Sequence, residues 1–266
     1  MRIFALLFSV LAVPAAAHEF WLEPTTYQIP VEGSLEADVV NGQDFGGTKL
    51  VYFPQRFTRF AVFAGDMTAN VEGRAGDRPA LHQPALAEGL NVVAYQAVNA
   101  TVDYATWEKF QSFVDHKDLG DVLTRHRERG LPEAGFEEVY SRYSKTLIGV
   151  GNSIGADSRT GLETEIVALT NPYTDDLSDG FNIQLFYRQD VRAETQIEVF
   201  EKTPAGDVSV AFYRTDADGI ATFPVTTGNS YMVDAVVLRE PAAVLQEETG
   251  AVWETLWANL TFAVPE

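Results

Sequence analysis

Short runs of strand-forming residues, separated by turns that contain glycine, fill the first hundred residues of this sequence and most constrain its fold. Candidate strands cover residues 35–40, 49–53, 57–64, 68–71 and 91–98. Between them stand turn pairs such as Gly33-Ser34, Gly46-Gly47 and Gly65-Asp66. Short runs bounded by such residues are typical of β-strands. Their spacing predicts a sandwich or a barrel.

After residue 104, the spacing of the apolar residues changes from that of strands to that of a helix. Four apolar residues recur at the spacing of one helix face: Trp107, Phe110, Phe113 and Val114. A second short helix is expected over residues 121–129, before the helix-ending Gly130-Leu131-Pro132. Residues 136–147 fit either a helix or a strand, because their apolar positions suit both periods.

Strands resume after the small-residue stretch 151–161. The candidates are residues 163–169, 181–187, 195–200, 209–215, 220–225, 231–238 and 257–264. We therefore predict an all-β fold with a short helical insertion, built as two β-sandwich domains of immunoglobulin-like or transthyretin-like type. The first domain is expected over residues 18–170, with its helical segment at 105–129, and the second over residues 171–266.

The N-terminus predicts export. Residues 1–17 carry one basic residue, Arg2, then an apolar run and the small residues Ala15, Ala16 and Ala17. This is the layout of a secretory signal peptide cut after Ala17, and the run is too short to span a bilayer. We expect a periplasmic protein with no stable membrane insertion after cleavage.

Composition limits the possible partners. The net charge of −19 argues against nucleic acids and anionic membrane surfaces. The chain has no cysteine, so any metal site has to use histidine, carboxylates, amides or the free amine. Nucleophile-elbow, phosphate-loop, dinucleotide and zinc-protease motifs are missing from the sequence, so we expect a protein that is not an enzyme.

Cleavage after Ala17 makes His18 the first residue of the mature chain. Its α-amino nitrogen and Nδ1 can then hold one metal ion in a six-membered chelate, and imidazole suits nickel, cobalt, copper and zinc. The alternative is that His18 merely follows the cleavage site. Among the other histidines, His116 is the best partner for His18, although a surface position is the simpler interpretation. The candidate metal ligands are therefore His18, His116 and the neighbouring Glu19.

Other candidates have simpler interpretations. His82 is expected to be a solvated loop residue, and His126 a surface residue of the second helix. Glu163 and Glu165 alternate on a candidate strand, so they either bind a cation on one face or point to water. Asp216 and Asp218 resemble the start of a calcium loop, but the later acidic residue is missing, which favours a simple turn.

The segment at the predicted cleavage site, Ala17-His18-Glu19-Phe20-Trp21-Leu22-Glu23-Pro24, resembles that of a bacterial periplasmic family. This family is often labelled a nickel/cobalt-uptake component and is otherwise titled a domain of unknown function. Three more segments are similar: Tyr140 to Lys145, the 163–173 connection with Asn171-Pro172-Tyr173, and the Trp253 to Phe262 closing segment. The resemblance implies a two-domain β-rich periplasmic protein linked to transition-metal uptake.

These observations lead to a ranked set of expectations. The first is a soluble periplasmic accessory that binds a nickel or cobalt ion, or a small metal chelate, and supports a membrane metal permease. The alternative is a non-catalytic cell-envelope interaction or glycan-binding protein. The third is a copper protein built on the N-terminal histidine. The closing segment 253–262 is expected to be structural, because its apolar residues suit a buried strand.

Overall fold

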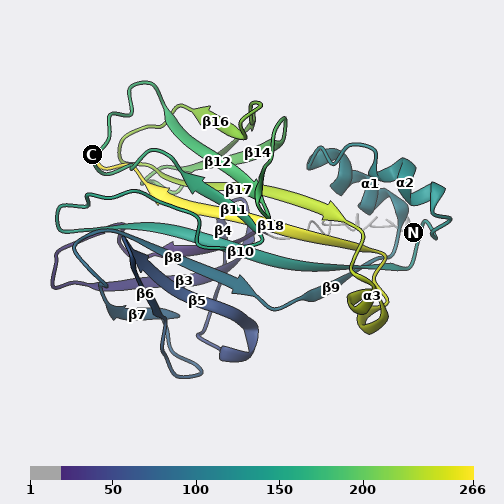
Figure 1. Ribbon diagram of the computed structural model, residues 1–266, viewed down its shortest axis with the longest axis horizontal. Helices are drawn as coiled ribbons and strands as arrows, with labels where there is room; N and C mark the ends of the chain where they lie inside the picture. The colour runs from purple at the N-terminus through teal and green to yellow at the C-terminus, as the bar shows by residue number, and fades with distance from the viewer. Residues whose placement is uncertain (1–18) are drawn as a thin grey trace, which may run out of the picture.

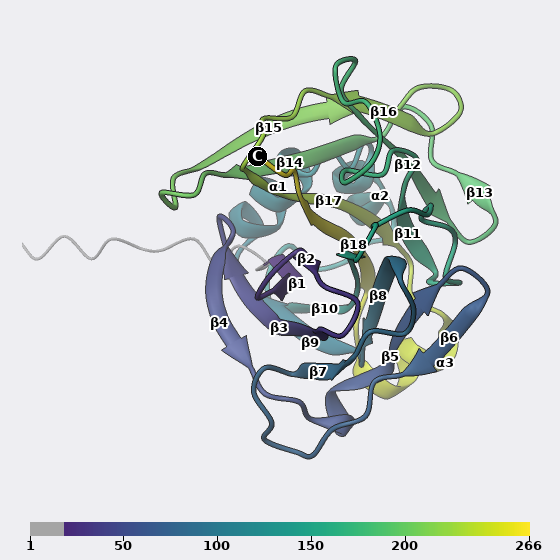
Figure 2. The ribbon, with the colours of Figure 1, turned by 90° about the vertical axis from the view of Figure 1, so that its left-hand side faces the viewer.

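The computed structural model describes residues 19–266, which form three β-sheets and three α-helices (Figure 1). Sheet A contains β1 (Glu19–Pro24), β3 (Ser34–Gln43), β4 (Gly46–Leu50) and β7 (Leu81–Pro84). Sheet C contains β11 (Thr164–Ala168), β12 (Phe181–Tyr187), β13 (Asp190–Val191) and β16 (Ile220–Phe223). Both pack on the larger sheet B (Figure 2). The predicted all-β fold with a short helical insertion is confirmed.

Sheet B follows the order β15-β14-β17-β18-β10-β8-β5-β6, and two further strands, β2 and β9, pair with β10. Its members are β2 (Gln28–Ile29), β5 (Phe57–Ala64), β6 (Met67–Asn70), β8 (Gly89–Ala97), β9 (Ala100–Tyr104), β10 (Phe136–Val150), β14 (Gln196–Lys202), β15 (Val208–Arg214), β17 (Ser230–Arg239) and β18 (Trp253–Ala263). All the predicted strands have counterparts, and β5 and β12 have the predicted bounds. The short strands β2, β7, β9 and β13 were not predicted, nor was β1.

Residues 136–147, whose apolar positions fitted either a helix or a strand, belong to the central strand β10. Leu147 packs against sheet C, whereas Ile148 and Val150 pack against sheet A, so both faces of the strand are covered. A strand buried on both faces shows no apolar–polar alternation. This is why periodicity alone could not separate strand from helix there.

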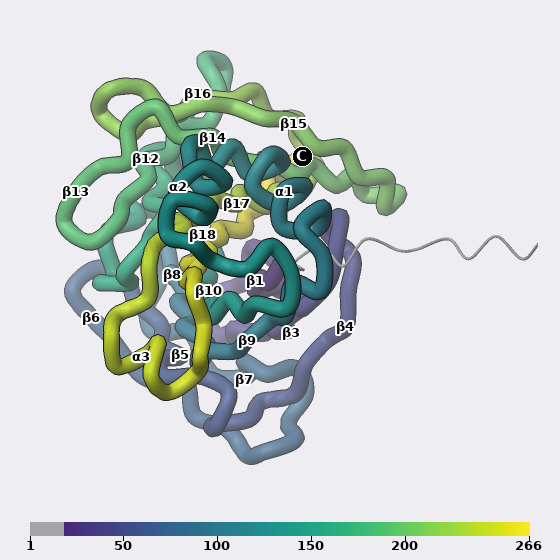
Figure 3. The backbone as a smooth tube through the Cα atoms, turned by 90° about the vertical axis from the view of Figure 1, so that its right-hand side faces the viewer, coloured from purple at the N-terminus to yellow at the C-terminus, as the bar shows by residue number. Residues whose placement is uncertain are grey.

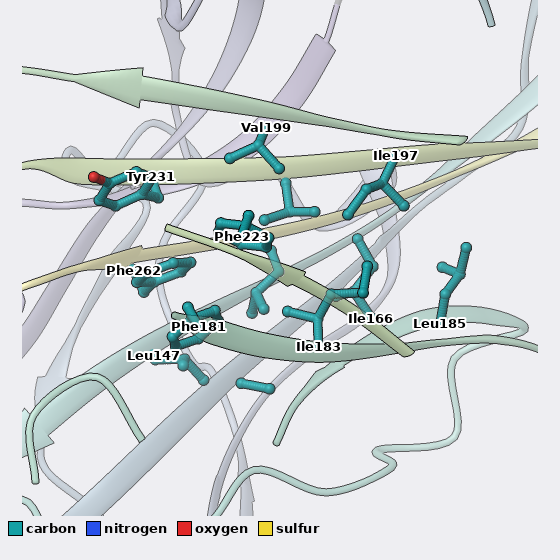
Figure 4. Close-up of a cluster of buried hydrophobic side chains, with 14 of the residues drawn as sticks. Leu147, Ile166, Phe181, Ile183, Leu185, Ile197, Val199, Phe223, Tyr231 and Phe262 are labelled. Atoms are coloured by element: carbon teal, nitrogen blue, oxygen red, sulfur yellow. The ribbon is translucent and has the colours of Figure 1, made fainter. Parts of the chain in front are cut away.

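Two main hydrophobic cores lie on opposite faces of the central strands. The core under sheet C joins β12 and β16 to β14, β17 and β18; within it, Phe181 stacks on Phe262 with ring centroids 4.0 Å apart (Figure 4). The core under sheet A contains Leu22, Leu35 and Leu81, each fully buried. Removing this apolar surface from water is the main favourable contribution to folding.

Sheet B crosses the predicted domain boundary at residue 170. β10 pairs in parallel with β18, with Glu138 opposite Trp253 and Thr146 opposite Thr261. β18 then pairs antiparallel with β17. Strands from both predicted domains therefore share one hydrogen-bonded sheet, and the two-domain division stays a prediction. The 253–262 segment, expected to be structural, is buried along β18.

The helices α1 (Trp107–His116) and α2 (Val122–Glu128) lie where the helical insertion was predicted, and they cover one end of sheet B (Figure 3). A third, short helix, α3 (Ala243–Thr249), was not predicted. The surface position expected for His126 is wrong. His126 is fully buried; its Nδ1 accepts a hydrogen bond from Trp253 Nε1 at 2.9 Å, and its Nε2 lies 2.9 Å from the Pro132 carbonyl oxygen.

Within residues 19–266, no helix combines the length and apolar character needed to cross a membrane. The predicted signal peptide 1–17 and His18 lie outside the described residues, so export and periplasmic location stay predictions.

Candidate ligand pocket

A pocket of about 310 Å³ lies where β1, α1, β14 and β15 meet. Its walls combine charged and apolar side chains: Glu19, Gln43, Asp44, Lys109, Ser112, Phe113, His116, Lys117, Glu198, Phe200, Val210, Phe212 and Trp257. A few polar groups set among aromatic and aliphatic side chains are typical of small-molecule sites. This pocket is the candidate functional site.

Glu19 opens strand β1, and the pairing of that strand with β3 places it opposite Gly42. Its side chain lines the pocket, yet the residue is only 7% exposed, and Oε2 has no hydrogen-bond partner among the described residues. Burial, followed by the charge of Asp234, raises the pKa of Glu19 to about 7. A buried carboxylate oxygen without a partner is costly in free energy, and a bound cation or donor would relieve that cost.

Two more carboxylates belong to this region: Glu198 lines the pocket, and Asp234 does not line it. Glu198 on β14 and Asp234 on β17 are directly opposite one another in the sheet, and both side chains are at most 3% exposed. Like charges opposite each other on one sheet face repel. Burial is the main cause that raises the pKa of Asp234, and Glu198 raises it further.

Lys117 offsets part of the charge of this pair. Its Nζ lies 2.7 Å from Glu198 Oε1 and 3.1 Å from Asp234 Oδ2, and it sits 4.7 Å from the ring centre of Trp257. Burial alone would lower the pKa of Lys117, but the two carboxylates together raise it. The ammonium group therefore remains charged and holds the two strands and the end of α1 together.

His116, the last residue of α1, lies at the mouth of the pocket. Its side chain is 54% exposed, its Nε2 is 3.4 Å from Glu198 Oε1, and its ring meets Phe212 edge-on at 5.7 Å. The backbone carbonyl of His116 accepts a hydrogen bond from Gln196 Nε2 at 2.8 Å, which ties the helix end to β14. The imidazole is therefore placed at the pocket and remains accessible to a ligand.

An aromatic wall closes the other side of the pocket. Phe113 of α1 stacks on Trp257 of β18, with ring centroids 5.7 Å apart and 24° between the ring planes. Trp257 Nε1 donates to Thr255 Oγ1 at 3.1 Å, so the indole is fixed in orientation. This wall can contact the apolar part of an organic ligand.

Of the three predicted metal ligands, the structure brings two to the same pocket. Glu19 and His116 both line it, and His18 lies outside the described residues. Across residues 19–266, no group of three or more His, Asp or Glu side chains is arranged to hold a metal ion. The described part of the chain thus offers two of the donors that the prediction needs.

The other carboxylate candidates have partners of their own. Glu165 is buried beside Lys145 Nζ at 3.2 Å, and Glu163 pairs with Arg239 and Arg188. Asp216 Oδ1 accepts the backbone N–H groups of Asp218 and Ile220, each at 2.9 Å. These bonds are those of a turn, as the sequence favoured.

The remaining histidine, His82, is exposed as predicted but lies on strand β7 rather than in a loop. Its Nδ1 is 3.1 Å from Glu36 Oε1.

Sequence reasoning missed Lys117, Glu198 and Asp234 as members of a site. The available signal was an acidic residue in the middle of an otherwise apolar strand run, as in Tyr231-Met232-Val233-Asp234-Ala235-Val236. A charged residue at such a position is almost never fully buried unless it is paired.

The structure is an all-β fold with a pocket lined by both acidic and aromatic side chains. The family model described as "Domain of unknown function (DUF4198)" matches residues 15–239, and the chain belongs to this family. This confirms the resemblance to a domain of unknown function seen in the sequence. Searches among curated proteins and among solved structures gave no match.

Proposed function

We propose that this protein is a non-catalytic periplasmic accessory that binds a nickel or cobalt ion, carried as a small chelate, for a membrane uptake system. The observation that carries the proposal is the unpartnered, buried Glu19 Oε2 in a pocket that His116 also lines. Glu19 directly follows His18 in the chain, so a mature N-terminus at His18 would begin beside this carboxylate.

The size and walls of the pocket support a chelate rather than a bare ion. A volume of about 310 Å³ is roughly ten times the share of one water molecule in the liquid. The stacked rings of Phe113 and Trp257 can contact an organic chelator. Glu19 and His116 would supply an oxygen and a nitrogen to the metal. In the cleaved protein, His18 would add its α-amino nitrogen and Nδ1, and the chelator would fill the remaining coordination positions.

The binding test compares matched variants of protein that has been exported and cleaved after Ala17. Glu19→Gln and His116→Gln each remove one proposed ligand, and His82→Gln removes an exposed histidine that does not line the pocket. Binding of Ni²⁺ with histidine as chelator is measured by calorimetry. Each pocket variant is expected to weaken binding about tenfold or more, which corresponds to about 1.4 kcal/mol.

The control His82→Gln is expected to bind as the parent protein does. Equal affinity in all four proteins would contradict the proposed site. Binding that is selective for Cu²⁺ and needs only the N-terminal histidine would favour the copper alternative.

A further inference from the structure

A second pocket, of about 260 Å³, lies on the other side of Lys117 from the candidate ligand pocket. It is formed by the connection between α1 and α2, the first turn of α2, the residues before β14 and the end of β17. Two arginines line it, Arg125 and Arg192. This arginine pocket shares only Lys117 with the first pocket, and the Nζ of Lys117 is occupied by Glu198 and Asp234.

Arg192 is held firmly by its backbone. Its N–H donates to the Leu185 carbonyl at 2.9 Å, and its own carbonyl accepts from Thr215 Oγ1 at 2.6 Å. The side chain is fixed at one point, because Nη2 donates to the Val236 carbonyl at 2.8 Å. The guanidinium is thus anchored where the edge of sheet B meets the helices.

The charge of Arg192 has no counter-charge. Within residues 19–266, no carboxylate lies within ion-pair distance of this guanidinium, and its buried Nη1 has no hydrogen-bond partner. Burial lowers the pKa of Arg192 to about 10, as expected for a cation removed from water without compensation. The side chain is only partly buried, but a charge whose buried Nη1 lacks a partner marks a position that an anion would stabilise.

Arg125 adds a second cation with free donors. Its nearest carboxylates are Glu240 at 3.6 Å and Asp121 at 4.0 Å, and its guanidinium makes no side-chain hydrogen bond in the described structure. Its Cζ lies 5.3 Å from the centre of the Trp253 ring, within the distance of a cation–π interaction. Of the two acidic residues that line the pocket, Asp118 is already paired with Arg214, and Glu194 is exposed.

We propose that the arginine pocket binds a small oxyanion, a carboxylate or a phosphate, through the guanidinium groups of Arg192 and Arg125. The forked N–H donors of arginine match two oxygens of such an anion. The overall charge of −19 repels anions, so binding here requires local donors rather than a general field.

The experiment titrates inorganic phosphate, and separately acetate, into the exported protein at pH 7 and constant ionic strength. Affinity is read by calorimetry and by the rise in melting temperature. Arg192→Met removes the partly buried cation, and Arg192→Lys keeps the charge but removes the forked pair of donors. Arg125→Gln removes the second cation. Arg74→Met, which removes an exposed arginine that does not line the pocket, is the matched control.

Saturable binding to the parent protein and to Arg74→Met is expected. Affinity should be lower by about tenfold or more in Arg192→Met, and by a smaller factor in Arg125→Gln. Arg192→Met is also expected to be at least as stable as the parent without added anion, because it removes a partly buried charge that has no counter-charge. Should it fail to fold, Arg192→Lys and Arg125→Gln decide the outcome. Unchanged affinity in both, or no saturable binding of either anion to the parent, would overturn the proposal.

Discussion

Replacing Lys117 by methionine tests how the candidate ligand pocket is held together. The substitution keeps most of the side-chain volume and removes the charge that lies 2.7 Å from Glu198 and 3.1 Å from Asp234. Two buried carboxylates are then left opposite each other on neighbouring strands. Each hydrogen bond to a charged group contributes about 1.5–3 kcal/mol. Breaking a buried pair costs about 3–5 kcal/mol. We expect the free energy of unfolding to fall by about this amount at pH 7.

The pH dependence of this loss has a definite sign. The carboxylates raise the pKa of Lys117 in the folded state, so its contribution is present at neutral pH and is lost only at strongly alkaline pH. In Lys117→Met, the pKa of Asp234, already raised by burial, rises further. Protonation of Asp234 then relieves the repulsion. The difference in the free energy of unfolding between the variant and the parent is therefore largest at neutral pH, and it becomes smaller as the pH falls toward about 4.

Urea unfolding, followed by circular dichroism at pH 4, 5, 6 and 7, measures this difference. Adding Asp234→Asn to Lys117→Met is expected to restore part of the stability, because a neutral amide then replaces one of the two carboxylates. A loss below about 1 kcal/mol that does not change with pH would refute the reasoning, since it would match an exposed ion pair.

Three further predictions concern buried side chains. Burial raises the pKa of Glu138 to about 7, above its value in the unfolded chain. The folded state therefore holds the proton of Glu138 more tightly, and the contribution of this residue to the free energy of unfolding is greatest at low pH. That contribution falls by about 3 kcal/mol as the pH rises from about 4.5 to 7. Glu138→Gln should remove this fall in the free energy of unfolding with pH, measured by urea unfolding. Trp257→Ala should destabilise the fold by about 3–5 kcal/mol and lower the melting temperature, because the ring is 2% exposed; an unchanged melting temperature would contradict a structural role. His126→Leu should lower the free energy of unfolding, measured in urea, by about 1–3 kcal/mol, because it leaves Trp253 Nε1 without its acceptor. A loss below about 0.5 kcal/mol would contradict this.

Local patterns predicted most of the fold because each depends on near neighbours in the sequence. The helical spacing from Trp107 onward matches α1, and the alternating run before Tyr187 matches β12. Strand β10 could not be assigned, because two sheets cover it and erase its alternation. His126 was misplaced for a related reason: its charged neighbours Arg125 and Arg127 hid an inward face that it shares with Val122, four residues earlier.

The candidate site was only partly predictable, since tertiary topology assembles it. Glu19 and His116 drew attention through the sequence around them, and both line the pocket. Lys117, Glu198 and Asp234 come together only because α1 ends over the junction of β14 and β17. No local pattern relates a lysine to carboxylates 81 and 117 residues further along the chain.

The most direct test of the proposed function compares two forms of the protein that differ only at the N-terminus. One is exported and cleaved after Ala17, and the other retains a methionine before His18. A chelate through the α-amino nitrogen requires the free amine, which the extra residue converts to an amide. The account predicts strong nickel binding, at one ion per chain, in the cleaved form, and binding weaker by about a hundredfold, or about 2.7 kcal/mol, in the extended form. Equal affinity in the two forms would contradict it.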